Sequence, residues 1–286
     1  MKGRMMQVMK TAVRFARRDH VAAVGGLVLL SLLFLGAFGP WLPLGDPDQI
    51  GAGPRFAAPS WAMPFGTDEL GRDLLPRIVR GIRATFVLAL ASVCGTAILG
   101  TLIGLYAAYV GRWVDTVIAR AMDIMFAFPA LMLGLLVAAV IGPGSISALA
   151  VILFATLPLF VRVVRSVTLG MVGRGFVTAA EVAGASRLRV MLVHLLPNVL
   201  GAVVVQFTYA VSIGILIESG LSFLGLGSQP PESSLGALLR LGSVYLTIAP
   251  WLALSAGVVL ALSIVAVNLL GDGLRDALEP LRGRRL

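Results

Sequence analysis

Acidic side chains are scarce in this chain, and their positions limit the chemistry that it could perform. Three of them, Asp68, Glu69 and Asp73, lie within six residues, and paired carboxylates are the groups that general acid–base catalysis uses. The same stretch holds Arg72 and Arg77, and an aspartate directly before an apolar run is typical of a helix N-cap. Helix capping and ion pairs with the two arginines therefore explain the cluster better than catalysis does.

Three further acidic residues lie near the ends of apolar segments. A charged group at the centre of a bilayer costs roughly 2.5–3.5 kcal/mol, and much less near a helix end. We therefore interpret Asp123 as paired with a neighbour such as Arg120, in preference to a proton relay. Glu218 could mark a transport or ion site, or could accept hydrogen bonds from N–H groups freed at a helix end beside glycines. Asp272 closes the last apolar segment.

The motifs of common enzymes are missing from the sequence. It contains no GxxxxGK[ST] phosphate loop, no HExxH and no GxSxG. Its two histidines, His20 and His194, are too far apart in the chain to suggest a metal site. We therefore predict that this chain is not an enzyme and has no catalytic residue, metal ligand or bound cofactor of its own.

The composition is that of a membrane protein. Of the 286 residues, 58% are hydrophobic and only 13% are charged, and the mean hydropathy is +0.95. A soluble domain carries roughly 25% charged residues. The net charge of +9 could suggest nucleic acid as a partner, but no basic patch interleaved with aromatic residues occurs. The lipid bilayer is the predicted surrounding, and the single Cys94 excludes a disulfide within the chain.

Six apolar segments are long enough to cross a bilayer. The third is interrupted by Phe128-Pro129, and the second carries Gly100 and Gly104, which favour close approach of another helix. The expected spans are Val21–Phe38, Thr85–Tyr109, Ala121–Ile141, Ser145–Val164, Val199–Ile217 and Trp251–Leu270.

The first segment has a basic leader, as a signal peptide does. Its apolar run is longer than the usual 7–15 residues and continues into Gly39-Pro40-Trp41-Leu42-Pro43, so we interpret it as an uncleaved span. The predicted organisation is a basic segment at 1–20, a first span at 21–42, a loop at 43–83, a five-helix core at 84–272 and a tail at 273–286. Within the loop, Arg77, Arg80 and Arg83 at helical spacing predict a helix lying on the membrane surface.

The distribution of positive charge predicts the orientation. With six spans, 17 of the 23 Lys and Arg residues fall on the side of the two termini and 6 on the other. The positive-inside rule then places both termini in the cytoplasm, together with the segment between the fourth and fifth spans.

That cytoplasmic segment, residues 170–198, contains the most informative pattern. The stretch 175–198 reads as an Ala-rich helix, a break at Gly184, a basic amphipathic helix and a stop at Leu196-Pro197-Asn198. A short rigid helix pair that joins two spans would tilt both when pushed. Arg187 and Arg189 could pair with acidic groups on a partner, or could serve only to set the orientation.

This segment resembles the EAA loop of the membrane subunits of bacterial ABC importers. In that motif an Ala-rich start precedes a Gly, and Leu-Pro follows twelve and thirteen residues after the Gly, as here; Thr178 stands where the family has Glu. The resemblance implies that the loop docks on the ATPase subunit through Thr178, Ala179, Ala180, Gly184, Ala185, Arg187, Arg189, Leu196, Pro197 and Asn198.

From about residue 15 to 282, the chain resembles the C-type permease subunit of the dipeptide/oligopeptide/nickel importer family. Five motifs occur in the family order, and they include Gly66, Thr67, Asp68, Gly71, Arg72, Asp73, Asp123, Pro129, Glu218, Gly225, Gly227, Asp272 and Gly273. The resemblance implies an all-α fold with six transmembrane helices, that of a type I ABC importer permease, in a bacterial inner membrane.

The resemblance also implies partners and cargo. The partners would be a homologous B-type permease, one or two ATPase subunits that bind ATP and Mg²⁺, and an extracytoplasmic substrate-binding protein. Di- and oligopeptides would be the cargo, with nickel, glutathione or haem as alternatives. A stand-alone secondary transporter or a membrane scaffold is the alternative of another class, although the former usually has more spans and midplane charges.

Overall fold

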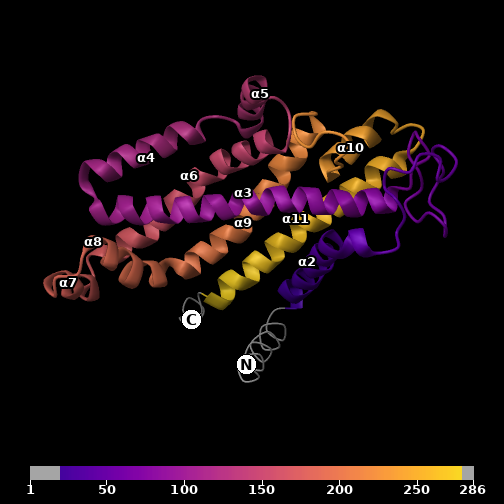
Figure 1. The fold of residues 1–286 in the computed structure, drawn as a ribbon. Helices are drawn as coiled ribbons and strands as arrows, with labels where there is room; N and C mark the ends of the chain where they lie inside the picture. Colours follow the sequence, from indigo (N-terminus) through magenta and orange to yellow (C-terminus); the bar gives the residue numbers. More distant parts are fainter. Residues whose placement is uncertain (1–19, 279–286) are drawn as a thin grey trace.

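The computed structural model describes residues 20–278, and the regular elements of this range are helices. The long helices run side by side, with α7 and α8 at one end of the molecule and the loop at 42–73 at the other (Figure 1). The predicted basic segment at 1–20, apart from His20, and the end of the tail at 279–286 lie outside the described residues.

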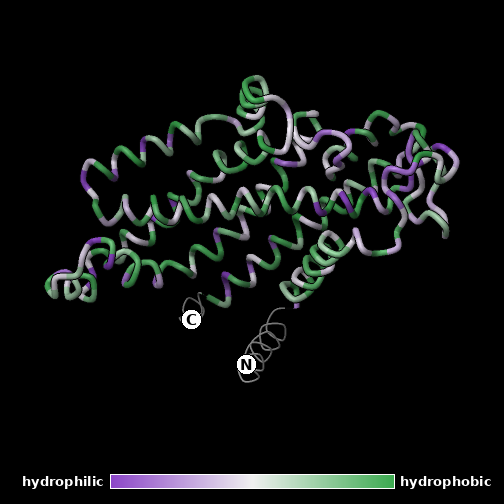
Figure 2. The backbone as a smooth tube through the Cα atoms, viewed as in Figure 1, coloured by the Kyte–Doolittle hydropathy of each residue, from purple (hydrophilic) through white to green (hydrophobic). Residues whose placement is uncertain are grey.

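Five of the described helices are long and apolar enough to cross a membrane, and the number is six if one bent helix pair is counted as a single span. The tube in Figure 2 is hydrophobic along most of these helices and hydrophilic at the two ends of the bundle. Large apolar side chains such as Leu27, Ile98 and Leu254 are exposed on the outside of the bundle, as a lipid environment requires. The all-helical, multi-pass prediction is confirmed.

Helix α2 (His20–Phe38) packs as an integral part of the bundle and continues into the short 3₁₀ helix η1 (Gly39–Trp41). It lies against α11 (Pro250–Leu278) and α3 (Leu74–Val110). A Cβ at Gly25 would lie 2.6 Å from Leu269 Cβ, so the small residue permits this close contact with α11.

Helix α3 corrects the prediction of a surface helix around Arg77, Arg80 and Arg83. These residues form the first turns of one continuous helix of 37 residues, about 55 Å long. A hydrocarbon core is only about 30 Å thick, so the helix extends well beyond it. Asp73 caps the helix by accepting a hydrogen bond from the Leu75 N–H at 3.0 Å, as predicted.

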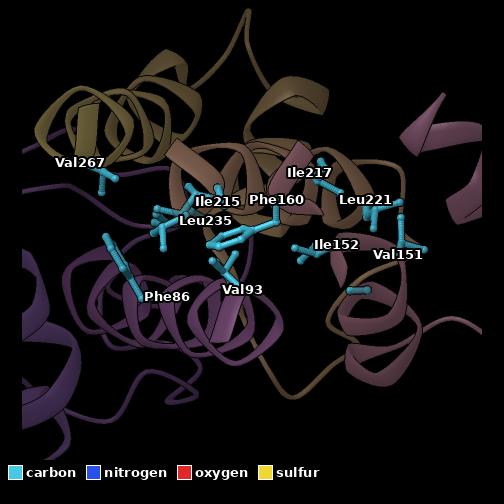
Figure 3. Packing of buried hydrophobic residues seen from close by; sticks show 14 of the residues in the cluster. Phe86, Val93, Val151, Ile152, Phe160, Ile215, Ile217, Leu221, Leu235 and Val267 are labelled. Carbon is cyan, nitrogen blue, oxygen red and sulfur yellow. The ribbon is translucent and has the colours of Figure 1, made fainter. Parts of the chain in front are cut away.

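The centre of the core is the contact of α3 with α6 (Ser145–Val172) and α9 (Leu196–Phe223). Gly100 and Gly104 allow this approach, since a Cβ there would lie 2.7 Å from Phe160 Cβ and 2.9 Å from the Val161 carbonyl oxygen. The predicted role of the two glycines is confirmed. Figure 3 shows the fully buried Phe160 among aliphatic side chains from the neighbouring helices.

The predicted third span corresponds to a bent helix pair, α4 (Arg112–Phe126) and α5 (Ala130–Ile141). The two axes differ by 86°, and Pro129 is the residue that precedes α5. The interruption at Phe128-Pro129 is confirmed, because a residue before proline is disfavoured in helical conformation. The predicted start at Ala121 was wrong: residues 112–120, expected as a loop, are the first turns of α4.

Between the fourth and fifth spans lie α7 (Gly175–Val182), α8 (Arg187–Arg189) and a π-helical turn, η2 (Val190–Leu195). The predicted stop at Leu196-Pro197-Asn198 was wrong, because α8, η2 and α9 form one helical run from Arg187 to Phe223. The wider π turn lies directly before Pro197, whose missing N–H would interrupt an α-helical ladder there. A short helix, α10 (Leu235–Val244), precedes α11.

Candidate functional site

Residues 170–198, from the end of α6 to the first turn of α9, form a compact helical module at one end of the molecule (Figure 1). Helix α7 buries Val177 completely. Gly184 follows the helix with a φ of +81°, a backbone conformation that residues other than glycine rarely adopt. Ser186 then caps α8 by accepting a hydrogen bond from the Arg189 N–H. The sharp reversal at Gly184 thus sets α7 beside the start of the fifth span.

The module is fastened to the second span as well as to the spans that it connects. The Tyr109 hydroxyl, at the end of α3, donates a hydrogen bond of 2.8 Å to Glu181 Oε1 on α7. The sequence predicts that a push on this segment tilts the fourth and fifth spans, which it joins directly. The structure adds α3 to the helices that hold it.

The predicted docking residues lie in two environments. Thr178, Ala179, Gly184, Arg187 and Arg189 are exposed, as are Pro197 and Asn198 on the first turn of α9. Ala180 and Ala185 are partly buried and pack against the hydrophobic core, and Leu196 does the same. These three contribute to the packing of the module and keep part of their surface exposed, and their contact with a partner stays a prediction.

The exposed apolar side chains of the module were not among the predicted docking residues. Val182 is 84% exposed and Leu188 is 63% exposed, on either side of Gly184. Phe176, Leu192 and Val193 are further exposed apolar residues of the same module. Leu188 precedes the buried Met191 and Leu195 by three and seven positions, which is the spacing of one helix face, so the sequence pattern alone would predict it to be buried.

At the opposite end of the molecule, Asp68 holds the loop at 42–73 together. Its buried carboxylate accepts hydrogen bonds from the Leu70 and Arg72 N–H groups and pairs with the Arg72 and Arg77 guanidiniums. Glu69 pairs with Arg72 at 3.1 Å. The ion pairs predicted for this cluster are confirmed, and every interaction of Asp68 is a structural one.

The remaining motif residues of this loop allow close contact. Thr67 is fully buried; its hydroxyl donates to the Pro54 carbonyl and accepts from the Ala57 N–H at 2.8 Å. Gly66 and Gly71 lie against carbonyl oxygens of residues 57 and 53, where a side chain would overlap. These residues therefore hold the loop in a defined shape above the start of α3.

Glu218 lies inside α9, five residues before its end, and is fully buried. It accepts hydrogen bonds from the hydroxyls of Thr85 at 2.8 Å and Ser222 at 2.7 Å. The expectation that it binds freed backbone N–H groups at a helix end was wrong, because the helix continues past it and hydroxyl donors surround it. Gly227 lies against Ser222, where a Cβ would overlap the hydroxyl oxygen.

Asp123 forms the predicted ion pair, with two partners. It lies 3.1 Å from Arg162 on α6 and 3.6 Å from Arg120. It stands near the end of α4, however, and not at the start of a helix. Together with the pair of Asp115 and Arg165, it fastens α4 to α6.

Asp272 and Gly273 lie in α11, which the structure describes as far as Leu278 instead of ending at these residues. Asp272 accepts a hydrogen bond from the Tyr209 hydroxyl, which ties α11 to α9. Gly273 is buried in the helix interface. Within residues 20–278, no three His, Cys, Asp or Glu side chains lie close enough together to hold a metal ion.

Curated relatives cover nearly the whole chain. The di/tripeptide transport system permease protein DppC of Pseudomonas aeruginosa is 40% identical over 90% of this chain and 88% of its own length. The dipeptide transport system permease protein DppC of Alkalihalophilus pseudofirmus is 36% identical over 95% and 89%. The glutathione transport system permease protein GsiD of Pectobacterium atrosepticum is 36% identical over 92% and 88%.

A solved structure shares the fold. An inward-facing conformation of the MetNI methionine ABC transporter matches 72% of this chain and 97% of the solved chain, with a TM-score of 0.56 and 19% identity. Residues 100–284 match the family described as binding-protein-dependent transport system inner membrane component. With the identity to the permeases above, this match shows that the chain is a multi-pass permease that belongs to the binding-protein-dependent transport system inner membrane component family.

Proposed function

We propose that this chain forms half of the translocation pathway of an ATP-driven importer of di- and oligopeptides, and that the module at residues 170–198 couples it to a separate ATPase subunit. The observation that carries the proposal is the mechanical position of the module. It projects from one end of the bundle and is joined directly to α6 and α9, and by Tyr109 to α3. A displacement of the module would therefore be passed to three spans.

The surface of the module suits a protein partner. Val182 and Leu188 offer apolar contact, and Arg187 and Arg189 make no ion pair with any residue in the range 20–278. Exposed apolar side chains beside unpaired arginines are a common composition for a protein interface. The two arginines are therefore available to acidic groups of a partner, the first of the two alternatives left by the sequence.

The remaining parts of the importer are supplied by other chains in this proposal. A homologous B-type permease completes the pathway, one or two ATPase subunits bind ATP and Mg²⁺, and an extracytoplasmic binding protein delivers the cargo. The charge distribution supports an orientation in which both termini and the module lie on the cytoplasmic side of a bacterial inner membrane. Peptides are favoured as cargo by the names of the relatives with 36–40% identity. Glutathione is a second candidate, because a relative named for it matches at 36%.

The test is a pair of substitutions at Gly184. No atom lies within 4 Å of the Cβ that a side chain would add there, so Gly184→Glu places a bulky negative charge on the module without a clash. We expect ATP-driven peptide uptake in proteoliposomes to fall by about tenfold or more, equivalent to about 1.4 kcal/mol. Membrane insertion and assembly with the partner subunits should remain close to wild type.

The control for backbone strain is Gly184→Asn. Left-handed backbone costs most residues roughly 1–2 kcal/mol, but asparagine tolerates it. The asparagine variant should therefore retain most of the uptake. Normal uptake by Gly184→Glu would contradict the coupling role, and equal loss in both variants would assign the effect to the backbone.

A further inference from the structure

A pocket lies at the loop end of the molecule, far from the coupling module. It has a volume of about 760 Å³ and is enclosed by the start of α3, the segment that follows α9, and α10. Pockets of roughly 300–1,000 Å³ are typical of sites for small ligands. Its walls carry five charged side chains, Asp48, Arg72, Arg77, Glu232 and Arg240.

Three of these charges are neutralised by the protein. Arg77 pairs with the buried Asp68, and Arg72 pairs with both Asp68 and Glu69, so two carboxylates balance the two guanidiniums. Asp48 pairs with Arg80 at 2.6 Å. These residues build the wall and leave little net charge toward a ligand.

The other two charges are not neutralised. Among residues 20–278, no carboxylate lies within 4.0 Å of the Arg240 guanidinium, and no cation lies within that distance of the Glu232 carboxylate. Within the described residues, the Glu232 carboxylate accepts one hydrogen bond, of 3.1 Å from the Ser145 hydroxyl. With respect to residues 20–278, the pocket therefore presents one cation and one anion without an ion-pair partner.

The position of Arg240 is defined by Gly225. A Cβ at residue 225 would overlap Arg240 Nη1, so the guanidinium lies directly over the glycine backbone. Gly225 has a φ of +80°, which also favours glycine. Because Gly225 has no side chain, the Arg240 guanidinium can lie against the pocket wall at this position.

The rest of the wall is apolar or has unused hydrogen-bonding capacity. Helix α10 lines the pocket with Leu241 and Val244, and Val244 is 70% exposed. Arg77 Nε and Ser228 Oγ, both on lining residues that are more than nine-tenths buried, have no hydrogen-bond partner in the described part of the chain. The combination is a cation, an anion and an apolar surface in one pocket.

We propose that this pocket binds a short peptide with free termini, with its carboxylate on Arg240, its ammonium group on Glu232 and its side chains against Leu241 and Val244. A guanidinium is the group best suited to a carboxylate, which it can bind through two parallel hydrogen bonds. The inference rests on the proposed function, because it assigns a binding site for the proposed cargo. It adds a peptide site on the permease itself, apart from the binding protein.

The direct test is saturation-transfer NMR on the assembled transporter in nanodiscs, without the binding protein. The probe is L-alanyl-L-phenylalanine, compared with its C-terminal amide and its N-acetyl form. We expect the free dipeptide to bind about tenfold more tightly than either blocked form, as the loss of one charge-assisted contact implies.

Variants assign each end of the peptide. Arg240→Gln should weaken the free dipeptide about tenfold and remove its advantage over the amide, while Arg240→Lys should have an intermediate effect. Glu232→Gln should remove the advantage over the N-acetyl form in the same way. The matched control is Arg55→Gln, an exposed arginine of the loop at 42–73 outside the pocket, which should bind as wild type.

Two results would overturn the proposal. One is equal binding of the free and amidated dipeptide to the wild type, or an undiminished difference in Arg240→Gln. The other is an Arg240→Gln variant that binds the dipeptide as wild type does but binds the peptide-free binding protein more weakly. That result would show that the pocket contacts the binding protein and not the peptide. Failure of the wild type to take up peptides at all would instead refute the proposed function.

Discussion

Thr85 and Glu218 connect three helices, α3, α9 and α10, through hydrogen bonds of the Thr85 hydroxyl. The Thr85 hydroxyl donates to Glu218 on α9 and accepts from the Leu235 N–H at the start of α10, at 3.2 Å. Thr85 and Glu218 are both fully buried. A buried donor or acceptor without a partner costs about 1–3 kcal/mol, so removal of this hydroxyl affects both neighbours.

We predict that Thr85→Val lowers the stability of the transporter and that Thr101→Val does not. Thr101 lies on the same helix and is also buried, but its hydroxyl has no hydrogen-bond partner in the described range. Thr85→Val should cost about 1–3 kcal/mol, while Thr101→Val should be neutral or slightly stabilising. Thermal unfolding of the purified complex in detergent measures both. Equal shifts in the two melting temperatures would contradict the role assigned to Thr85.

At the scale of elements, α7 is held from three sides. Its ends continue toward α6 and α8, Val177 packs into the core, and the contact of Tyr109 with Glu181 adds α3. The last contact is a single hydrogen bond near the surface, so its effect on folding stability is small, about 0.5–1.5 kcal/mol. The same hydrogen bond joins α7 directly to the end of the 37-residue α3, so a displacement of α7 would be passed to α3 through it.

We predict that Tyr109→Phe lowers peptide uptake severalfold while assembly and ATP hydrolysis are retained. The substitution removes only the hydroxyl that binds Glu181. The matched control is Tyr106→Phe, one turn earlier on α3, where the tyrosine is 49% exposed and makes no side-chain hydrogen bond within the described residues. The ratio of peptide transported to ATP hydrolysed in proteoliposomes is the measurement. Wild-type coupling in Tyr109→Phe would exclude the contact of Tyr109 with Glu181 from the coupling path.

The whole molecule has two unlike ends. One carries the module at 170–198, where Arg187 and Arg189 make no ion pair with any residue in the range 20–278. The other carries the loop at 42–73, in which Arg72 pairs with Asp68 and Glu69, and Asp48 pairs with Arg80 (Figure 1). The excess of positive charge beside the module predicts that this end faces the cytoplasm. The peptide pocket would then open on the opposite side, where a binding protein would deliver cargo.

We predict that the loop at 42–73 faces the outside and the module faces the cytoplasm. Labelling with a membrane-impermeant maleimide tests this orientation, after Cys94, the single cysteine, is replaced with serine. Trp61→Cys in the loop should react in intact spheroplasts, because Trp61 is fully exposed. Val182→Cys, beside Gly184, should react only after the membrane is permeabilised, although Val182 is 84% exposed. The reverse pattern would invert the topology, and with it the placement of the module and the pocket.

The sequence by itself determined the class of the protein and most local features. Hydropathy identified the spans, and the interruption at Phe128-Pro129, the cap at Asp73 and the ion pairs of Asp68 followed from neighbouring residues. These features depend on contacts within a few positions or on the composition of one segment, which a single sequence displays. The match at Gly184 and Leu196-Pro197 pointed to the family in the same way.

Only the tertiary structure decided how far helices extend and which distant residues meet. Helix α3 begins eleven residues before its predicted start, and the fifth span begins before Pro197, because packing and continuous hydrogen bonding stabilise turns that are too polar for a hydropathy pattern. Thr85 and Glu218 are 133 residues apart, and Arg240 meets Gly225 across a turn. Such contacts result from the arrangement of whole helices, to which no local pattern corresponds.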